Sequence, residues 1–270
     1  MDIHKPKPWH GVREFLKEYV IIVVGVLTAL GAEQVAEWLH WREQVALADE
    51  ALTAEVQVNL NRSYQRIVVA ACQRDRLAEL RDLLLKPGPA WKGVPVVPST
   101  TFHDPPKSEL EKVARLGSTS YTGADNASAI GSVYLTPSAG WPEAAWSSAV
   151  ASGVFNHMDR QRAATFGRLY RTFERLRDQQ QAEQPAKARL AVLAYDRTLT
   201  EAEKNDFIQT LGALNAANVG MEIAAAQLLL DADKNGLRIK ASDAKATLDE
   251  IAASPRVSCY RPVKIPLAPG

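Results

Sequence analysis

Hydrophobic residues form one continuous run near the start of the chain, whereas further along they recur every three or four positions. The run lies within residues 15–41, FLKEYVIIVVGVLTALGAEQVAEWLHW, and carries no charge between Tyr19 and Ala32. An α-helix rises ~1.5 Å per residue, so the 19 steps from Tyr19 to Trp38 cover ~28 Å. Because the hydrocarbon core of a bilayer is ~30 Å thick, residues 15–41 are predicted to form a membrane anchor helix.

The side chains along this helix indicate how it would sit in a bilayer. Tyr19 at one end, and Trp38 and Trp41 at the other, are placed for the aromatic belts of the two membrane interfaces. Glu33 lies more than a turn inside the second belt, so it must reach the interface, pair, or face a partner helix. Small residues share one face, which predicts close packing against another membrane helix: Gly25, Ala29, Ala32 and Ala36.

Two other interpretations of the apolar run remain open. A cleaved signal peptide has the same basic-then-apolar layout, with a small-residue cleavage site near residues 29–32. A buried core helix of a soluble protein also reaches this length. We favour the anchor because the helical pattern continues past residue 41 without a breaker.

The charges that flank the run predict its orientation. Four basic residues precede it, whereas residues 33–50 contain only one, Arg42; the four are Lys5, Lys7, Arg13 and Lys17. By the positive-inside rule the N-terminus stays in the cytoplasm and the rest is exported. In a bacterium this corresponds to a single-pass protein of the inner membrane with a periplasmic domain.

Residues 33–86 continue the anchor as an amphipathic helix that ends at Pro87-Gly88-Pro89. Apolar residues step by three or four along its first part, namely Trp41, Val45, Ala48, Leu52, Val56 and Leu60. The stripe is extended by Ile67, Leu77, Leu80 and Leu84. A continuous helix of this length is a rod of ~80 Å. Its apolar stripe must be buried against later helices or against a second copy of the chain.

The remaining chain alternates between Pro-rich or Gly-rich segments and helices. Residues 87–107 are predicted to be extended, residues 108–117 to form a short helix capped by Ser108 and Glu111, and residues 117–140 to form a loop with a short strand at 132–135. We expect a helix from Trp141 to about Gly153, one from Asn156 to about Pro185, and a short one over 186–195. Thr200 and Glu203 form a capping box before a helix that closes at Asn235-Gly236, and a last helix covers 242–253.

The predicted fold class is therefore all-α, with few segments of period two. The chain is predicted to consist of a cytoplasmic arm (1–14), an anchor helix (15–41), a helical extracytoplasmic domain (42–253) and an extended Pro-rich tail (254–270). The domain is expected to be an irregular helical bundle onto which the anchor continues as a long amphipathic helix.

Composition narrows the partners and the chemistry. The chain has 270 residues and a net charge of +1 with both signs interspersed, so nucleic acid is not expected as a partner. Cys72 and Cys259 are the only cysteines. In an oxidising compartment they are candidates for one disulfide that ties the tail to the first helix, the alternative being two buried thiols.

No motif identifies a catalytic, cofactor or metal site. Residues 231–236 (DADKNG) match the opening of an EF-hand calcium loop, but Ser242 stands where a bidentate Glu should close it, so we interpret the segment as a helix end. Residues 242–245 spell S-x-x-K without its companion motifs, and the five histidines lack metal-ligand spacing. Asn59, Asn61 and Tyr64 either line a polar pocket or, as we prefer, lie on a solvated face.

Two stretches resemble a group of uncharacterised bacterial single-pass membrane-anchored proteins. The first combines Glu18, the G-V-L-x-A-L run at 25–30, a Trp at 38 or 41, and Asn59. The second is a W-x-x-x-x-x-S-G pattern followed by a helix and a tyrosine, and its residues are Trp146, Ser152, Gly153 and Tyr170. The resemblance covers about a third of the chain and implies an anchored helical extracytoplasmic domain, with no activity attached to it.

Three functional hypotheses follow. The first is a non-enzymatic anchored protein that binds itself or another envelope protein, with the lipid bilayer as its other partner. The second is a periplasmic ligand-binding or sensor module that relays to a partner, with a pocket built from residues 117–140 and the helices of 141–176. The third is an enzyme with an unrecognised site. No cofactor is expected, and any small-molecule ligand is unknown.

Overall fold

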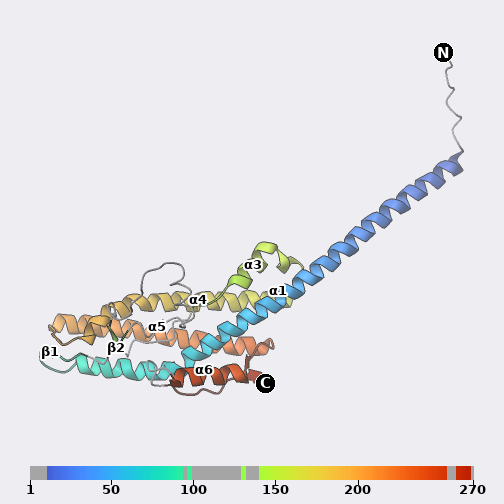
Figure 1. Ribbon diagram of the computed structural model, residues 1–270. Helices are drawn as coiled ribbons and strands as arrows, with labels where there is room; N and C mark the ends of the chain where they lie inside the picture. The colour runs from blue at the N-terminus through green and yellow to red at the C-terminus, as the bar shows by residue number, and fades with distance from the viewer. Residues whose placement is uncertain (1–10, 94–95, 99–128, 132–139, 254–259, 269–270) are drawn as a thin grey trace, which may run out of the picture.

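The computed structural model describes residues 11–93, 96–98, 129–131, 140–253 and 260–268. Its dominant element is α1 (Val12–Leu84), a single helix of 73 residues that leaves the rest of the molecule as a long rod (Figure 1). The predicted continuity between the apolar run and the amphipathic helix is confirmed. The helix ends as expected just before Pro87, and Gly88 adopts a positive φ of 98° in the turn that follows.

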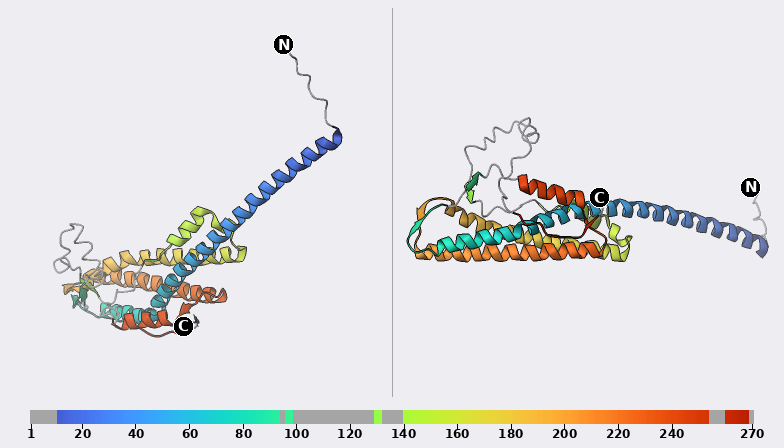
Figure 2. Two further views of the ribbon diagram at one scale, coloured as in Figure 1. Left: turned by 45° about the vertical axis from the view of Figure 1, so that its right-hand side comes forward. Right: turned by 90° about the horizontal axis from the view of Figure 1, so that it is seen from below.

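The other helices form a bundle with the second half of α1. They are α3 (Ala144–Ser152), the 3₁₀ turn η3 (Val154–Asn156), α4 (Arg160–Leu190), the 3₁₀ turn η4 (Ala191–Ala194), α5 (Glu201–Lys234) and α6 (Ala241–Ala253). The central helix is α5, which packs along both α1 and α4 and runs antiparallel to them (Figures 1 and 2). The shorter helix α3 lies beside α1 near the point where α1 leaves the bundle.

The strands of the described residues are two or three residues long. They pair as β1 (Ala90–Trp91) with β4 (Arg197–Thr198) antiparallel, β2 (Val96–Pro98) with β3 (Ala129–Gly131) antiparallel, and β5 (Ile239–Lys240) with β6 (Leu267–Ala268) parallel. The all-α class is confirmed. The helix predicted over 108–117 and the strand predicted over 132–135 lie outside the described residues.

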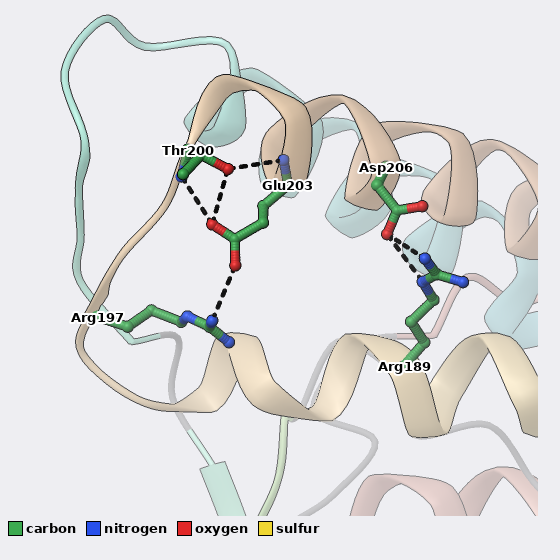
Figure 3. Close-up of polar contacts among 5 residues, drawn as sticks. All are labelled: Arg189, Arg197, Thr200, Glu203 and Asp206. Atoms are coloured by element: carbon green, nitrogen blue, oxygen red, sulfur yellow. Dashed lines mark hydrogen bonds and ion pairs between the residues drawn. The ribbon is translucent and has the colours of Figure 1, made fainter.

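A capping box fixes where α5 begins. The predicted capping box is confirmed at α5, where the Thr200 hydroxyl accepts from the Glu203 N–H at 3.2 Å and the Glu203 carboxylate accepts from the Thr200 N–H at 2.8 Å (Figure 3). The same carboxylate pairs with Arg197 at 3.2 Å, and Arg189 of α4 pairs with Asp206 of α5 at 2.5 Å. These contacts join the end of α4 to the start of α5.

Three predicted helix boundaries are wrong. The first helix after the loop begins at Ala144 rather than Trp141, because Trp141 is buried and the Pro142 carbonyl accepts a hydrogen bond from Asn59. Helix α4 is capped by Asp159, not Asn156, which belongs to η3. It also continues through Pro185 to Leu190. Pro185 and Gln181 are exposed, so the carbonyl that loses its helical partner at the proline lies on the solvent side.

A layer of polar side chains separates two apolar clusters in the bundle. The larger cluster lies toward α3 and α6, and includes Leu52, Val56, Phe166, Phe173 and Leu228. The smaller one lies around the α4–α5 turn, and includes Leu80, Leu84, Leu190, Leu193 and Phe207. Between them, buried polar residues come from all three long helices: Arg66 and Gln73 of α1, Glu183 of α4 and Asn218 of α5.

Candidate functional site

The first third of α1 exposes an apolar surface on every side. The exposed large hydrophobic side chains between Phe15 and Leu30 have exposed fractions from 50% at Val20 to 66% at Phe15 and Ile21. They are Phe15, Leu16, Tyr19, Val20, Ile21, Ile22, Val24, Val26, Leu27 and Leu30. By length and composition this stretch is apolar enough to cross a membrane, and none of its most hydrophobic window is buried against the described bundle. The alternative of a buried core helix is therefore wrong for this segment.

Helix α5 is also long and apolar enough to cross a membrane, but its environment differs. The apolar window of α5 is partly buried, and Leu214, Ala225 and Leu228 of this helix belong to the two core clusters. Packing in the core of the bundle explains the apolar residues of α5, so this helix is interpreted as a core helix. Of these two helices, only α1 has an apolar segment, its first third, that no other described residues cover.

The small residues predicted to pack against another membrane helix lie within this exposed segment. Gly25, Ala29, Ala32 and Ala36 are all exposed, and a Cβ placed on Gly25 would meet no described atom within 4 Å. The described chain therefore leaves the whole small-residue face accessible, and the proposed helix-to-helix contact stays a prediction.

Helix α1 meets the rest of the domain at Trp41. The indole of Trp41 stacks on the imidazole of His157, which follows η3, with ring centroids 3.8 Å apart and planes inclined by 10°. Two open clefts border Trp41. The first, which we call the Trp38 cleft, measures about 400 Å³ and is lined by Gln34, Glu37, Trp38, Trp41, Arg42, Val45 and His157. The second measures about 410 Å³ and lies between α1 and α3.

The pocket predicted between residues 117–140 and the helices of 141–176 stays a prediction. The second cleft is lined by Ala145, Ser148 and Ser152 of that helical region, but its other wall is α1, at His40, Gln44 and Leu47 among others. Most of residues 117–140 lie outside the described residues.

Glu55 holds α3 against α1. Its carboxylate accepts from the N–H groups of Ala145 and Trp146 at 2.9 and 3.2 Å, in the first turn of α3, where the helix dipole favours a negative charge. It also accepts from the Tyr170 hydroxyl at 2.5 Å. Burial, followed by the hydrogen bond to Glu55, raises the pKa of Tyr170 well above its usual value. Trp146 stacks on Tyr170 at 4.6 Å, which closes this contact between α1, α3 and α4.

The polar layer contains an ion triad that joins α1 to α4. Arg66, whose side chain is 4% exposed, pairs with the fully buried Glu183, and Glu183 also accepts from Lys187 at 2.7 Å. Burial lowers the pKa of Arg66, and it also lowers the pKa of Lys187 despite the neighbouring Glu183. The Arg66 guanidinium also lies against the sulfur of Met221 of α5.

The preferred interpretation of Asn59 and Tyr64 as a solvated face is wrong. Asn59 is fully buried and Tyr64 is 4% exposed, because both point from α1 toward the bundle. Asn59 donates to the Pro142 carbonyl at 2.9 Å, and Asn61 accepts from Thr247 of α6 at 2.8 Å. These side chains fix neighbouring segments to α1, and none of them lines either cleft.

Residues 231–236 form a helix end, as expected. Asn235 Nδ2 donates to the Asp231 carbonyl at 2.7 Å, Asp233 pairs with Arg238, and Gly236 has a φ of 74°. Within the described part of the chain, no group of three or more His, Cys, Asp or Glu side chains could hold a metal ion.

Cys72 is buried and disulfide-bonded. The only other cysteine, Cys259, lies outside the described residues, so the predicted pairing is not itself described. The chain directly after it lies on α1: the Arg261 N–H donates to the Val68 carbonyl at 2.8 Å, and the Arg261 side chain pairs with Asp75 at 2.6 Å. The tail therefore returns to the turn of α1 that carries Cys72.

Comparison with known proteins finds no matching family model, no similar curated protein and no similar solved structure.

Proposed function

We propose that this chain is a membrane-anchored helical protein that acts by protein–protein interaction or self-association in the bacterial envelope, without catalysis of its own. The observation that carries the proposal is the exposed apolar segment of α1, which continues without interruption into a folded helical domain. The lipid bilayer covers that segment, and the domain stands on the periplasmic side.

The exposed segment supports insertion into a bilayer on energetic grounds. Fully burying a large apolar side chain stabilises by ~1.5–3 kcal/mol, so the ten exposed side chains between Phe15 and Leu30 correspond to a term on the order of 10 kcal/mol or more. A water-soluble chain would not keep such a surface uncovered. The four basic residues before Tyr19 keep the N-terminus in the cytoplasm.

The small-residue face of the same segment supports self-association. Small side chains at Gly25, Ala29, Ala32 and Ala36 allow two helix backbones to approach closely, and all four are exposed. A second copy of α1, or the anchor of another envelope protein, packs against this face.

Membrane insertion is tested by a single charge in the middle of the segment. Eight Val, Ile and Leu residues between Tyr19 and Ala32 each favour insertion by ~0.3–0.6 kcal/mol, whereas a central Asp opposes it by ~2.5–3.5 kcal/mol. Val26→Asp should therefore move the full-length chain out of the membrane fraction. Val58→Asp, at an exposed valine of the same helix within the domain, is the matched control and should stay in it. Wild-type chain recovered from the cytosol without detergent would refute the proposal.

Topology and association are tested in cells. Protease added to intact spheroplasts should degrade the domain, since it faces the periplasm, and a protected domain would contradict the orientation.

Crosslinking in membranes should trap a dimer or a partner complex. Gly25→Leu should reduce the yield of the crosslinked complex, whereas Gly31→Leu, about 120° around the helix from Gly25, should not. A chain that crosslinks neither to itself nor to any other protein would refute the interaction role.

A further inference from the structure

We propose that the Trp38 cleft binds the headgroup of a zwitterionic phospholipid, that is, a lipid with a phosphodiester and a protonated amine. The inference rests on the proposed function, because it requires that the apolar segment of α1 lie in a bilayer. It adds a specific ligand and a site to what would otherwise be a simple anchor.

The cleft lies at the level of the headgroups when the anchor is inserted. With Trp38 at the hydrocarbon boundary, Trp41 and Arg42 lie ~5–6 Å further along the helix axis. The headgroup layer adds ~5–8 Å on each side of the hydrocarbon. Leu30 and Leu27, one and two turns before Gln34 on the same side of α1, are exposed and provide an apolar surface for the acyl chains of the bound lipid.

The Trp41 wall of the cleft is held by a contact within the protein. Trp41 is held by its stacking contact with His157, so α1 and the segment after η3 both contribute to the cleft. A ring that is already held in place loses little conformational freedom when a ligand binds against it. Its volume of about 400 Å³ lies within the ~300–1,000 Å³ range of small-ligand sites.

The charges of the cleft match a zwitterion. The Arg42 guanidinium lies 5.4 Å from the centre of the Trp38 ring, and Glu37 is the one acidic residue of the lining. Within the described part of the chain neither Arg42 nor Glu37 makes an ion pair. Arg42 is therefore placed to bind a phosphodiester, and Glu37 to bind an ammonium group. A headgroup with only a negative charge would leave Glu37 uncompensated.

The test measures which lipids stay bound to the full-length protein. The protein is reconstituted in an equimolar mixture of phosphatidylethanolamine and phosphatidylglycerol, extracted in mild detergent and analysed by native mass spectrometry. We expect phosphatidylethanolamine to be retained preferentially. Inorganic phosphate at millimolar concentration should not displace it, because the acyl chains contribute to binding. Displacement by phosphate would identify a plain anion site and overturn the inference.

Variants assign the roles of the two charges. Arg42→Gln should lower the retention of phosphatidylethanolamine about tenfold or more, since a hydrogen bond to a charged group is lost. Glu37→Gln should shift the preference toward phosphatidylglycerol, because the repelling carboxylate is removed. Glu43→Gln, an exposed carboxylate outside the cleft lining, is the matched control for Glu37→Gln and should change neither. Unchanged thermal unfolding of each variant shows that the fold is intact.

The two proposals fail in different ways. A wild-type chain that does not float with vesicles overturns the anchor and this inference together. A chain that floats but retains both lipids equally, with no effect of Arg42→Gln or Glu37→Gln, leaves the anchor in place and overturns only the headgroup site.

Discussion

The buried triad of Arg66, Glu183 and Lys187 makes a sharp prediction about the stability of the bundle. Replacing Glu183 with Gln keeps the size and shape of the side chain but removes the only carboxylate of the triad. Arg66, 4% exposed, and Lys187, 14% exposed, would then both lose the buried carboxylate that they share. Removing one partner of a buried ion pair typically costs ~3–5 kcal/mol, which is a large fraction of the ~5–15 kcal/mol that stabilises a typical domain.

The assay is urea unfolding of the full-length chain in mild detergent, followed by far-UV circular dichroism and tryptophan fluorescence. Glu183→Gln should lower the free energy of unfolding by about 3 kcal/mol or more. Asp82→Asn is the matched control. It removes the carboxylate of the exposed pair Arg81–Asp82, where both side chains are more than half exposed, and should change the free energy by about 0.5 kcal/mol or less.

A triple variant separates lost charge pairing from general damage. Changing Arg66 and Lys187 to Met and Glu183 to Leu removes every charge of the triad and keeps the layer filled. Apolar replacement of a whole buried ion group is often neutral or stabilising, so the triple variant should recover most of the loss. The reasoning is refuted if Glu183→Gln costs less than about 1 kcal/mol, or if the triple variant is as unstable as the single one.

Three further predictions concern neighbouring contacts. Burial lowers the pKa of Lys187, so the unfolded chain binds more protons than the folded chain at pH values between the lowered pKa and 10.5. The free energy of unfolding should therefore rise with pH in that window. Lys187→Met should flatten this rise in unfolding curves taken from pH 7 to 10. Cys72→Ser should destabilise by ~2–5 kcal/mol and abolish the effect of reductant on the melting temperature, whereas a wild-type melting temperature unaffected by reductant would contradict the disulfide. Glu55→Gln should lower the raised pKa of Tyr170 in a spectrophotometric titration, while Glu50→Gln on the exposed side of α1 should not.

The elements that sequence predicted best are those with a strong local cause. The apolar run, the 3.6-residue stripe of α1 and the capping box at Thr200 each depend on residues close together in the chain, and all three are confirmed. The boundary at Pro185 was wrong for a tertiary reason. Glu183 and Leu190, on either side of the proline, are both buried, so packing of the helix outweighs the one missing backbone hydrogen bond.

The polar layer was missed, although a signal for it exists. The apolar stripe of α4 steps through Phe166, Phe173 and Leu176, and the same spacing continues through Glu183 and Lys187 to Leu190. Polar residues that keep the register of a buried stripe indicate a buried polar layer, whereas a change of register indicates a solvated face. The Trp41–His157 stack and the Glu55 contact with α3 had no such signal, because each joins segments far apart in the chain.

The continuity of α1 determines how the anchor and the domain are related. After Gly31 the helix contains neither Gly nor Pro up to its end at Leu84, and sharp helix kinks arise mainly at such residues. The contacts of Trp41 with His157 and of Glu55 with α3 fix the bundle to the same helix just beyond the apolar segment. If the apolar segment spans a bilayer as proposed, no Gly or Pro lies between it and the bundle, so the height and tilt of the bundle follow those of the anchor helix. Two anchor helices that pack through the face around Gly25 would then bring their domains together in one defined arrangement. A headgroup bound at Trp38 would contact the same helix that determines this arrangement.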